Sequence, residues 1–284
     1  MRTKFPGAAI VVLLATAAAP ACAVVDADFK YTEREEKRFT TGGKPQVTVS
    51  TFDGAIEIRP WDRNEVLVVV EKRGSNKEDV QPIAVRASQD GDRVTVDVTS
   101  THDRNVFFGF VGRSAKLIVS LPAASEVTAK SGDGSIDVES VAGTVDLRSG
   151  DGSIHARALT GDVTATTGDG SIDVSGKLTA LRAHSGDGSV HIHADQGSAP
   201  SADWDITTGD GSVTLEIPDN FSGELDAHTG DGGIHMDGVA VSDTPNGERD
   251  RQSRRRNSVR GRIGSGGKSI RIRTGDGSIT LRRS

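Results

Sequence analysis

Aspartates between glycines are the residues of this chain best placed to do chemistry, because they recur at a regular spacing. Gly-Asp-Gly triplets begin at seven positions, and the first three intervals between them are each 18 residues. Repeated carboxylates can ligate Ca²⁺, which prefers oxygen ligands. The candidate calcium ligands are Asp133, Asp151, Asp169, Asp187 and Asp210, with Asp231 and Asp276 in the two later triplets.

A tight turn explains the same aspartates without an ion. Asp is common in turns because its carboxylate accepts a hydrogen bond from a backbone N–H nearby. Calcium-binding β-rolls are built from a nonapeptide whose glycines and aspartate stand in a different register, and this sequence does not reproduce it. We therefore prefer the turn interpretation and expect no cofactor, with calcium as the alternative.

Histidines and aspartates follow the triplets at matching positions. If equivalent positions stack, one outward column contains Asp137, His155, Asp173 and His191, then Thr214, His235 and Thr280. Opposite-charge neighbours of this kind contribute ~0.2–1 kcal/mol each. Imidazoles also bind transition metals, but a straight column does not close a tetrahedral shell. We expect an exposed charge ladder.

A basic segment interrupts the repeat in a chain whose net charge is −6. It lies in the longest interval between triplets, so we expect a solvated loop that leaves the repeat and rejoins it. Its alternative role is docking to an anionic partner such as an envelope polymer. Nucleic acid is not expected, because no aromatic residues interleave with the arginines for base stacking. The candidate anion-binding residues are Arg254, Arg255, Arg256, Arg260 and Arg262.

No catalytic constellation stands out in the sequence. The single cysteine, Cys22, lies near the N-terminus, and the Gly-Asp-Gly-Ser motif recurs in most repeats rather than marking one site. A unique active site would break the repeat. We therefore predict a protein that is not an enzyme, with no catalytic residues, and keep a carbohydrate-active β-helix enzyme as an alternative.

The first residues read as an export signal. Arg2 and Lys4 precede an apolar core, and Ala21-Cys22-Ala23 offers a cleavage site of small residues. We expect cleavage after Ala23 and a location in the periplasm or at the cell surface. The alternative is a lipid anchor on Cys22. No later run of 18 apolar residues could span a membrane.

Apolar and polar residues alternate on both sides of each triplet, as in half-buried strands. Val145 and Leu147 precede one triplet, and Ile154 and Ala156 follow it. Two architectures fit this pattern: antiparallel hairpins or a solenoid of stacked coils. The constant spacing favours stacking, because stacked coils must have equal lengths. We predict an all-β parallel β-solenoid (β-helix) with 18-residue coils of two short strands each.

The predicted organisation is a single solenoid domain at residues 46–284, after a signal peptide and a short leader. The cap of the first coil is expected at Phe107–Val111, the densest apolar run. The predicted segments are a signal peptide (1–23), a leader (24–45), less regular coils and cap (46–125), regular coils (126–236), an Arg-rich insertion (237–269) and a closing coil (270–284).

These features together resemble the bacterial putative-adhesin domain family, a group of exported β-solenoids of unknown function. The resemblance rests on the alternating start Gln46–Ile58, the segment Ala115–Pro122, the serial triplets and the closing Ile270–Leu281. It implies a single-chain β-helix in the cell envelope. We predict an adhesin-like interaction protein whose partner is an anionic envelope polymer, a glycan or a surface protein. A calcium-binding envelope module is the further alternative.

Overall fold

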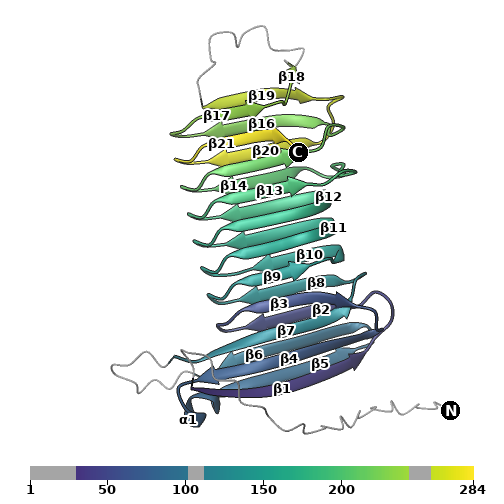
Figure 1. Ribbon diagram of the computed structural model, residues 1–284, viewed down its shortest axis with the longest axis vertical. Helices are drawn as coiled ribbons and strands as arrows, with labels where there is room; N and C mark the ends of the chain where they lie inside the picture. The colour runs from purple at the N-terminus through teal and green to yellow at the C-terminus, as the bar shows by residue number, and fades with distance from the viewer. Residues whose placement is uncertain (1–29, 102–111, 243–256) are drawn as a thin grey trace, which may run out of the picture.

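The computed structural model describes residues 30–101, 112–242 and 257–284. Within them all regular structure is β-strand, apart from the four-residue helix α1 (Lys77–Val80). The strands lie on one another in an elongated stack (Figure 1). The predicted all-β class is confirmed. The predicted signal peptide, Cys22 and the Phe107–Val111 cap lie outside the described residues.

Each coil contributes to two faces that the Gly-Asp-Gly turns join. The strands before the turns form face A, and those after the turns form face B. In spatial order face A contains β6 (Arg93–Ser100), β2 (Gln46–Thr51), β8 (Glu126–Ser131), β10 (Ala142–Arg148), the second halves of β11 (Ile154–Thr167) and β12 (Ile172–Ser185), β14 (Trp204–Thr208), β20 (Ser269–Thr274) and β16 (Gly223–Thr229).

Face B follows the same path. In spatial order it contains β7 (Ser114–Pro122), β3 (Ile56–Trp61), β9 (Ile136–Glu139), the first halves of β11 and β12, β13 (Val190–Ala194), β15 (Val213–Ile217), β21 (Ile279–Arg283) and β17 (Ile234–Asp237). Strands β11 and β12 run through the looser turn, so they belong to both faces.

Neighbouring strands within these two faces are parallel and keep equivalent positions in register. Val145 pairs with Val163, and Val163 pairs with Leu181. Each step is one coil of 18 residues, as the repeat predicts. Parallel pairing therefore holds through the body of the stack, and antiparallel pairing is confined to its ends.

The alternating apolar residues fill one continuous core. Positions such as Leu147 and Ile154 are fully buried. Trp204 and Phe221 pack in the C-terminal part, with ring centroids 5.1 Å apart. Ile234 and Met236 were expected to point inward and are only partly buried, because β17 is the last strand of face B.

Antiparallel strands close the N-terminal end. β4 (Glu65–Gly74) pairs with β7, β1 (Tyr31–Thr40) pairs with β4, and β5 (Ile83–Asp90) pairs with β6. β1 lies inside the segment predicted as a leader and is charged at six of its ten positions. Its inward Glu35 pairs with Lys72 at 3.2 Å. A charged edge strand resists pairing with other chains.

The coil that is last in the sequence is not last in space. β20 lies between β14 and β16, and β21 lies between β15 and β17. Figure 1 accordingly places the C-terminus inside the stack. Residues 270–284 were expected to close the stack, but they enter one coil before its end.

Two further strands lie beyond this point. β19 (Ser258–Ile263) pairs antiparallel with β16 and with β18 (Val241–Ser242). The segment 237–269, expected to be a loop, is therefore partly strand. At the other end the first coil, β2 and β3, is likewise covered on both sides, by β6 and β7 and by β8 and β9.

Candidate interaction faces and turn edge

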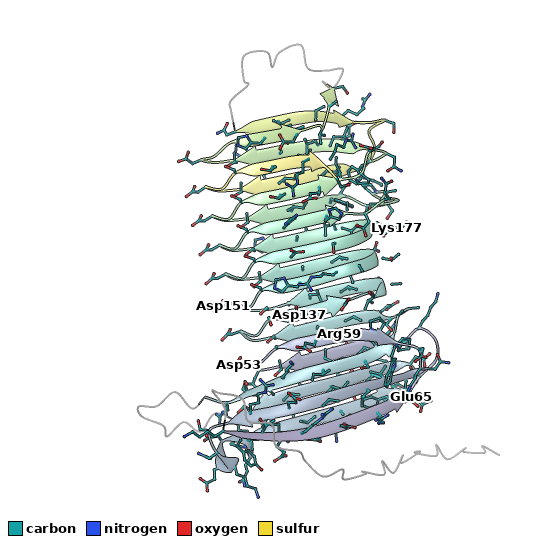
Figure 2. All side chains as sticks on the ribbon, viewed as in Figure 1. Asp53, Arg59, Glu65, Asp137, Asp151 and Lys177 are labelled. Atoms are coloured by element: carbon teal, nitrogen blue, oxygen red, sulfur yellow. The ribbon has the colours of Figure 1, made fainter. Side chains whose placement is uncertain are left out.

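The triplet aspartates form a column along one long edge of the stack, here called the turn edge. Figure 2 shows Asp53 and Asp151 on this edge and Lys177 on the opposite one. Successive triplets are joined by backbone hydrogen bonds, such as that from the Gly186 N–H to the Gly168 carbonyl oxygen at 2.5 Å. The five candidate calcium ligands are exposed along it: Asp133, Asp151, Asp169, Asp187 and Asp210.

The two glycines of each triplet are there because the stacked turns lie in close contact. A Cβ on Gly186 would be 2.5 Å from the carbonyl oxygen of Gly168, and one on Gly168 would be 2.6 Å from that of Gly150. Backbone atoms cannot move aside as a side-chain tip can. Only the central position of each triplet can therefore carry a side chain, which projects into solvent.

A buried column of hydroxyls lies directly beneath the turn edge. The residue before each triplet is a serine or threonine, yet Ser185 and Thr208 are buried. The Ser185 Oγ donates to the Gly170 carbonyl oxygen at 2.8 Å and accepts from the Gly188 N–H at 3.0 Å. The signal was present in the sequence, since Ser185 continues the inward alternation of Leu181 and Ala183. The members of the hydroxyl column are Thr51, Ser131, Ser149, Thr167, Ser185, Thr208, Thr229 and Thr274.

The structure brings no metal centre together among the residues that it describes. No three of its His, Cys, Asp and Glu residues converge as metal ligands there. At Asp53 burial raises the pKa, the like charge of Asp133 raises it further, and a backbone hydrogen bond from Gly54 opposes both. The turn edge thus combines a hydrogen-bonded turn with repulsion between neighbouring coils.

The predicted ladder of aspartates and histidines is present on face B. Asp137 pairs with His155, His155 with Asp173, and Asp173 with His191. The order of the later members differs from the expectation. Thr280 follows Thr214 and precedes His235, because β21 enters between β15 and β17.

Glu216 holds the densest polar cluster of face B, which the sequence reading missed. Its carboxylate oxygens lie 2.9 Å from the His191 Nε2 and 2.9 Å from the His193 Nδ1. Arg282, from the last coil, donates to the same carboxylate. His193 also contacts Asp195 at 3.3 Å. The cluster could not be found from spacing alone, because Arg282 is distant in sequence.

Electrostatics favours the charged form of this carboxylate. Burial acts to raise the pKa of Glu216, but hydrogen bonds from Arg282, His193 and His191 outweigh it and lower that pKa to about 2. The side chain is only 12% exposed. Glu216 is therefore ionised at all physiological pH values and links three coils.

Two described arginines of the basic segment are each paired with a carboxylate. Arg260 and Arg262 lie on β19, where they pair with Asp226 at 2.9 Å and Glu224 at 3.2 Å. The other three candidate anion-binding residues, Arg254, Arg255 and Arg256, lie outside the described residues. The structure therefore brings together two of the five, each beside a carboxylate.

With the coils and faces established, comparison with protein families decides the relationship. The model of the Toastrack DUF4097 family matches residues 46–199 and again residues 177–282. The chain belongs to this family. The two matches of the Toastrack model cover the coils from β2 to the last one, and the resemblance to a putative-adhesin domain family is confirmed.

Solved structures are similar in outline only. A putative cell adhesion protein from Clostridium sporogenes is 13% identical, with 89% of this chain and 100% of that one covered, at a TM-score of 0.39. A putative adhesin from Bacteroides fragilis is 10% identical, with 89% and 97% covered, at a TM-score of 0.45. At TM-scores below 0.5, these structures tell us nothing about the role of this chain.

A comparison with curated proteins and a search for a membrane-spanning helix both gave negative results. No curated protein matches the chain. No helix in the described residues is long and apolar enough to cross a membrane.

Proposed function

We propose that this Toastrack protein is an adhesin-like, non-enzymatic surface protein of the bacterial envelope. The observation that carries the proposal is the register of the coils, which lays equivalent side chains in straight outward columns over both faces. A surface of this kind offers a repeating polymer many equal contacts at one spacing. Weak contacts that repeat add up, because each further one is made at a high effective concentration.

One hollow of the described surface is smaller than a usual pocket for a small ligand. A hollow on face A, lined by residues that include Gln46, Thr48, Arg93 and Glu126, has a volume of about 170 Å³. Pockets for small ligands usually measure about 300–1,000 Å³.

The partner we propose is a glycan or an anionic polymer of the envelope, met outside the cytoplasm. An array of glycans and envelope polymers tests this, read once with millimolar Ca²⁺ and once with chelator. Retained, saturable binding without hydrolysis products is the expected result. Hydrolysis products would favour the carbohydrate-active enzyme, and binding that vanishes with chelator would favour the calcium module.

Two variants assign the binding face. Asp173→Arg places a bulky charge in the middle of face B, and Thr166→Arg does the same on face A. Both positions are outward and partly exposed, so the fold should tolerate either. Loss of binding in one variant alone identifies the face. Full binding by both variants would refute the proposal. So would a parent chain that binds nothing on the array with Ca²⁺ or with chelator.

A further inference from the structure

The last coil of the chain, residues 269–283, is called the inserted coil because two earlier coils enclose it. It carries four arginines, of which Arg271 and Arg273 lie on face A and Arg282 and Arg283 lie on β21. The enclosing coils are residues 204–217 and residues 223–237. The positions of these coils that face Arg271 and Arg282 are acidic, which raises the question of what selects this order.

Register places one arginine between two carboxylates on each face. On face A, Arg271 is the neighbour of Asp205 on one side and of Asp226 on the other. The Arg271 Nη1 lies 3.8 Å from the Asp205 Oδ2, and the Arg273 Nη2 lies 2.7 Å from the Asp226 Oδ2.

Face B repeats the arrangement. Arg282 is the neighbour of Glu216 in β15 and of Asp237 in β17. Arg282 forms an ion pair with Glu216, the carboxylate that also holds His191 and His193. The inserted coil is therefore tied to the earlier coil on both faces of the stack.

Stacking in simple sequence order would bring like charges together. Aligning the triplets that begin at Gly209 and Gly230 would set Asp205 beside Asp226 and Glu216 beside Asp237, since each pair has the same separation in sequence. Adjacent strands lie about 4.8 Å apart, and carboxylates that close repel. The observed order replaces both repulsions with attraction to arginine.

The core is apolar in either order. Leu215, Leu281 and Met236 occupy equivalent inward positions of the three coils, so apolar side chains meet apolar side chains either way. The triplets are also interchangeable, because each supplies the same two glycines. What changes between the two orders is the pairing of charges.

The outer side of the enclosing coil is also matched by charge. Arg260 of β19 pairs with Asp226 from the side opposite the inserted coil. Burial acts to raise the pKa of Asp226, but hydrogen bonds from Arg273 and Arg260 outweigh it and lower that pKa. An acidic strand, β16, thus lies between two basic strands, and its outer edge is already occupied.

We propose that these charges select the position of the inserted coil: arginines on the last coil and carboxylates on its neighbours direct it between two coils that precede it in the sequence. The order of the C-terminal coils is then encoded in outward-facing side chains. The core supplies stability to any order and the charges supply the choice.

Cysteine cross-linking reads the order directly. In a Cys22→Ala chain, Thr214→Cys with Thr280→Cys joins neighbouring strands of the observed order, whereas Thr214→Cys with His235→Cys joins neighbours of the sequence order only. A disulfide needs Cα atoms within about 7 Å, which excludes strands two places apart at about 4.8 Å per step. After refolding, the first pair should cross-link and the second should not. A Thr214–His235 cross-link that dominates over the Thr214–Thr280 cross-link at low salt, in the chain with native charges, would overturn the observed order.

The role of charge is tested on the same cysteine pairs. Asp205→Asn with Glu216→Gln removes both the attraction and the repulsion, so the yield of the Thr214–His235 cross-link should rise about tenfold, which corresponds to about 1.4 kcal/mol. The matched control, Asp146→Asn with Glu139→Gln, removes the same charges from the same two columns in the regular coils and should change nothing. Equal yields in the variant and the control would overturn the proposal.

Salt gives a second measurement that needs no charge substitution. Refolding in about 1 M salt shortens the screening length to roughly 3 Å, so the Thr214–His235 yield should rise in the chain with native charges. In the variant Asp205→Asn with Glu216→Gln, the yield of the Thr214–His235 cross-link should not depend on salt. A yield that does not depend on salt in the chain with native charges would also overturn the proposal.

Discussion

The regular coils of residues 126–194 and the C-terminal coils of residues 204–284 share turns and core but differ in how their order is fixed. In the regular part each coil stacks on the one before it, and a looser turn of a few residues joins them. In the C-terminal part a long segment separates β17 from β20, and the last coil enters between two earlier ones.

The difference shows that a repeat fixes how coils stack but does not fix the order in which they follow one another in the stack. A short connection limits the reach of the next coil, although residues 218–222 still carry the chain from β15 past the place of the inserted coil to β16. A long connection removes that restriction at little entropic cost. Specific side-chain pairs must then choose among places that the core accepts equally.

The first coil at the N-terminal end also has charge pairs to both of its neighbours. β3 lies between β7 and β9. Its Glu57 pairs with Lys116 of β7, and its Arg59 pairs with Glu139 of β9, although Glu57 also faces Asp137 in register. The first coil can be covered on each side as the chain continues past it. The last coil instead lies between two coils that precede it in the sequence.

The largest expected loss of stability comes from substituting a triplet glycine in the regular coils. Gly186→Ala places a Cβ 2.5 Å from the Gly168 carbonyl oxygen and should lower the free energy of unfolding by about 3 kcal/mol. Gly233→Ala, at the position after the triplet of the coil 223–237, meets only the tip of the His235 ring at 3.2 Å and should cost little. Denaturant melts of both variants check this. Similar losses would show that contact between stacked turn backbones is not what requires glycine in the triplets.

The hydroxyl column is the next interaction to test. Ser185→Ala leaves the Gly170 carbonyl and the Gly188 N–H without their buried partner, and we expect a loss of about 2 kcal/mol. Ser189→Ala, at an exposed position of the same turn, is the control and should stay close to the parent. If the Ser185 variant melts like the control, the column does not contribute to stacking.

The Glu216 cluster tests how much charge pairs contribute to the stability of the C-terminal coils. Its pKa in the folded chain, about 2, lies below the ordinary 4.5, so its contribution is complete above pH 4.5 and disappears as the pH falls towards 2. Glu216→Gln should lower the free energy of unfolding by about 1 kcal/mol at pH 7. Its difference from the parent should shrink between pH 4.5 and 2.

The control for this pH series is Glu224→Gln, whose carboxylate is 37% exposed beside Arg262. It should cost less at pH 7. A Glu216 variant whose deficit stays constant down to pH 2 would contradict the ionised cluster.

The smallest effect is expected at the turn edge. The raised pKa of Asp53 means that folding disfavours its ionised form, so Asp53→Asn should stabilise the chain at pH 7 by a few tenths of a kcal/mol. The gain should vanish as the pH falls below 3.8, the ordinary pKa of an aspartate. Asp62→Asn, at an exposed position outside the column, is the reference. Destabilisation by Asp53→Asn would mean that the turn needs the charge.

Much of the fold could be predicted because it depends on local patterns. Alternation around Val145 and Ile154 specified strands, and the constant interval between triplets specified coils in register. The face B column from Asp137 to His191 followed from the same interval. The buried hydroxyls were misjudged because Ser and Thr are usually exposed, and their partners are backbone atoms of another coil.

The Glu216 cluster and the paired state of Arg260 and Arg262 could not be predicted in the same way. Each joins residues that are far apart in the sequence and meet only after the last coil and β19 have taken their places. No interval in the sequence encodes those meetings.

The sequence by itself determined the strands, the tight turns and the spacing of the coils, because alternation and glycine act over a few residues. Only the tertiary structure decided that the last coil lies inside the stack and that antiparallel strands close both ends. The physical reason is that equal coils offer equal apolar surfaces, so the choice among positions depends on pairs of side chains that come together only in the folded stack.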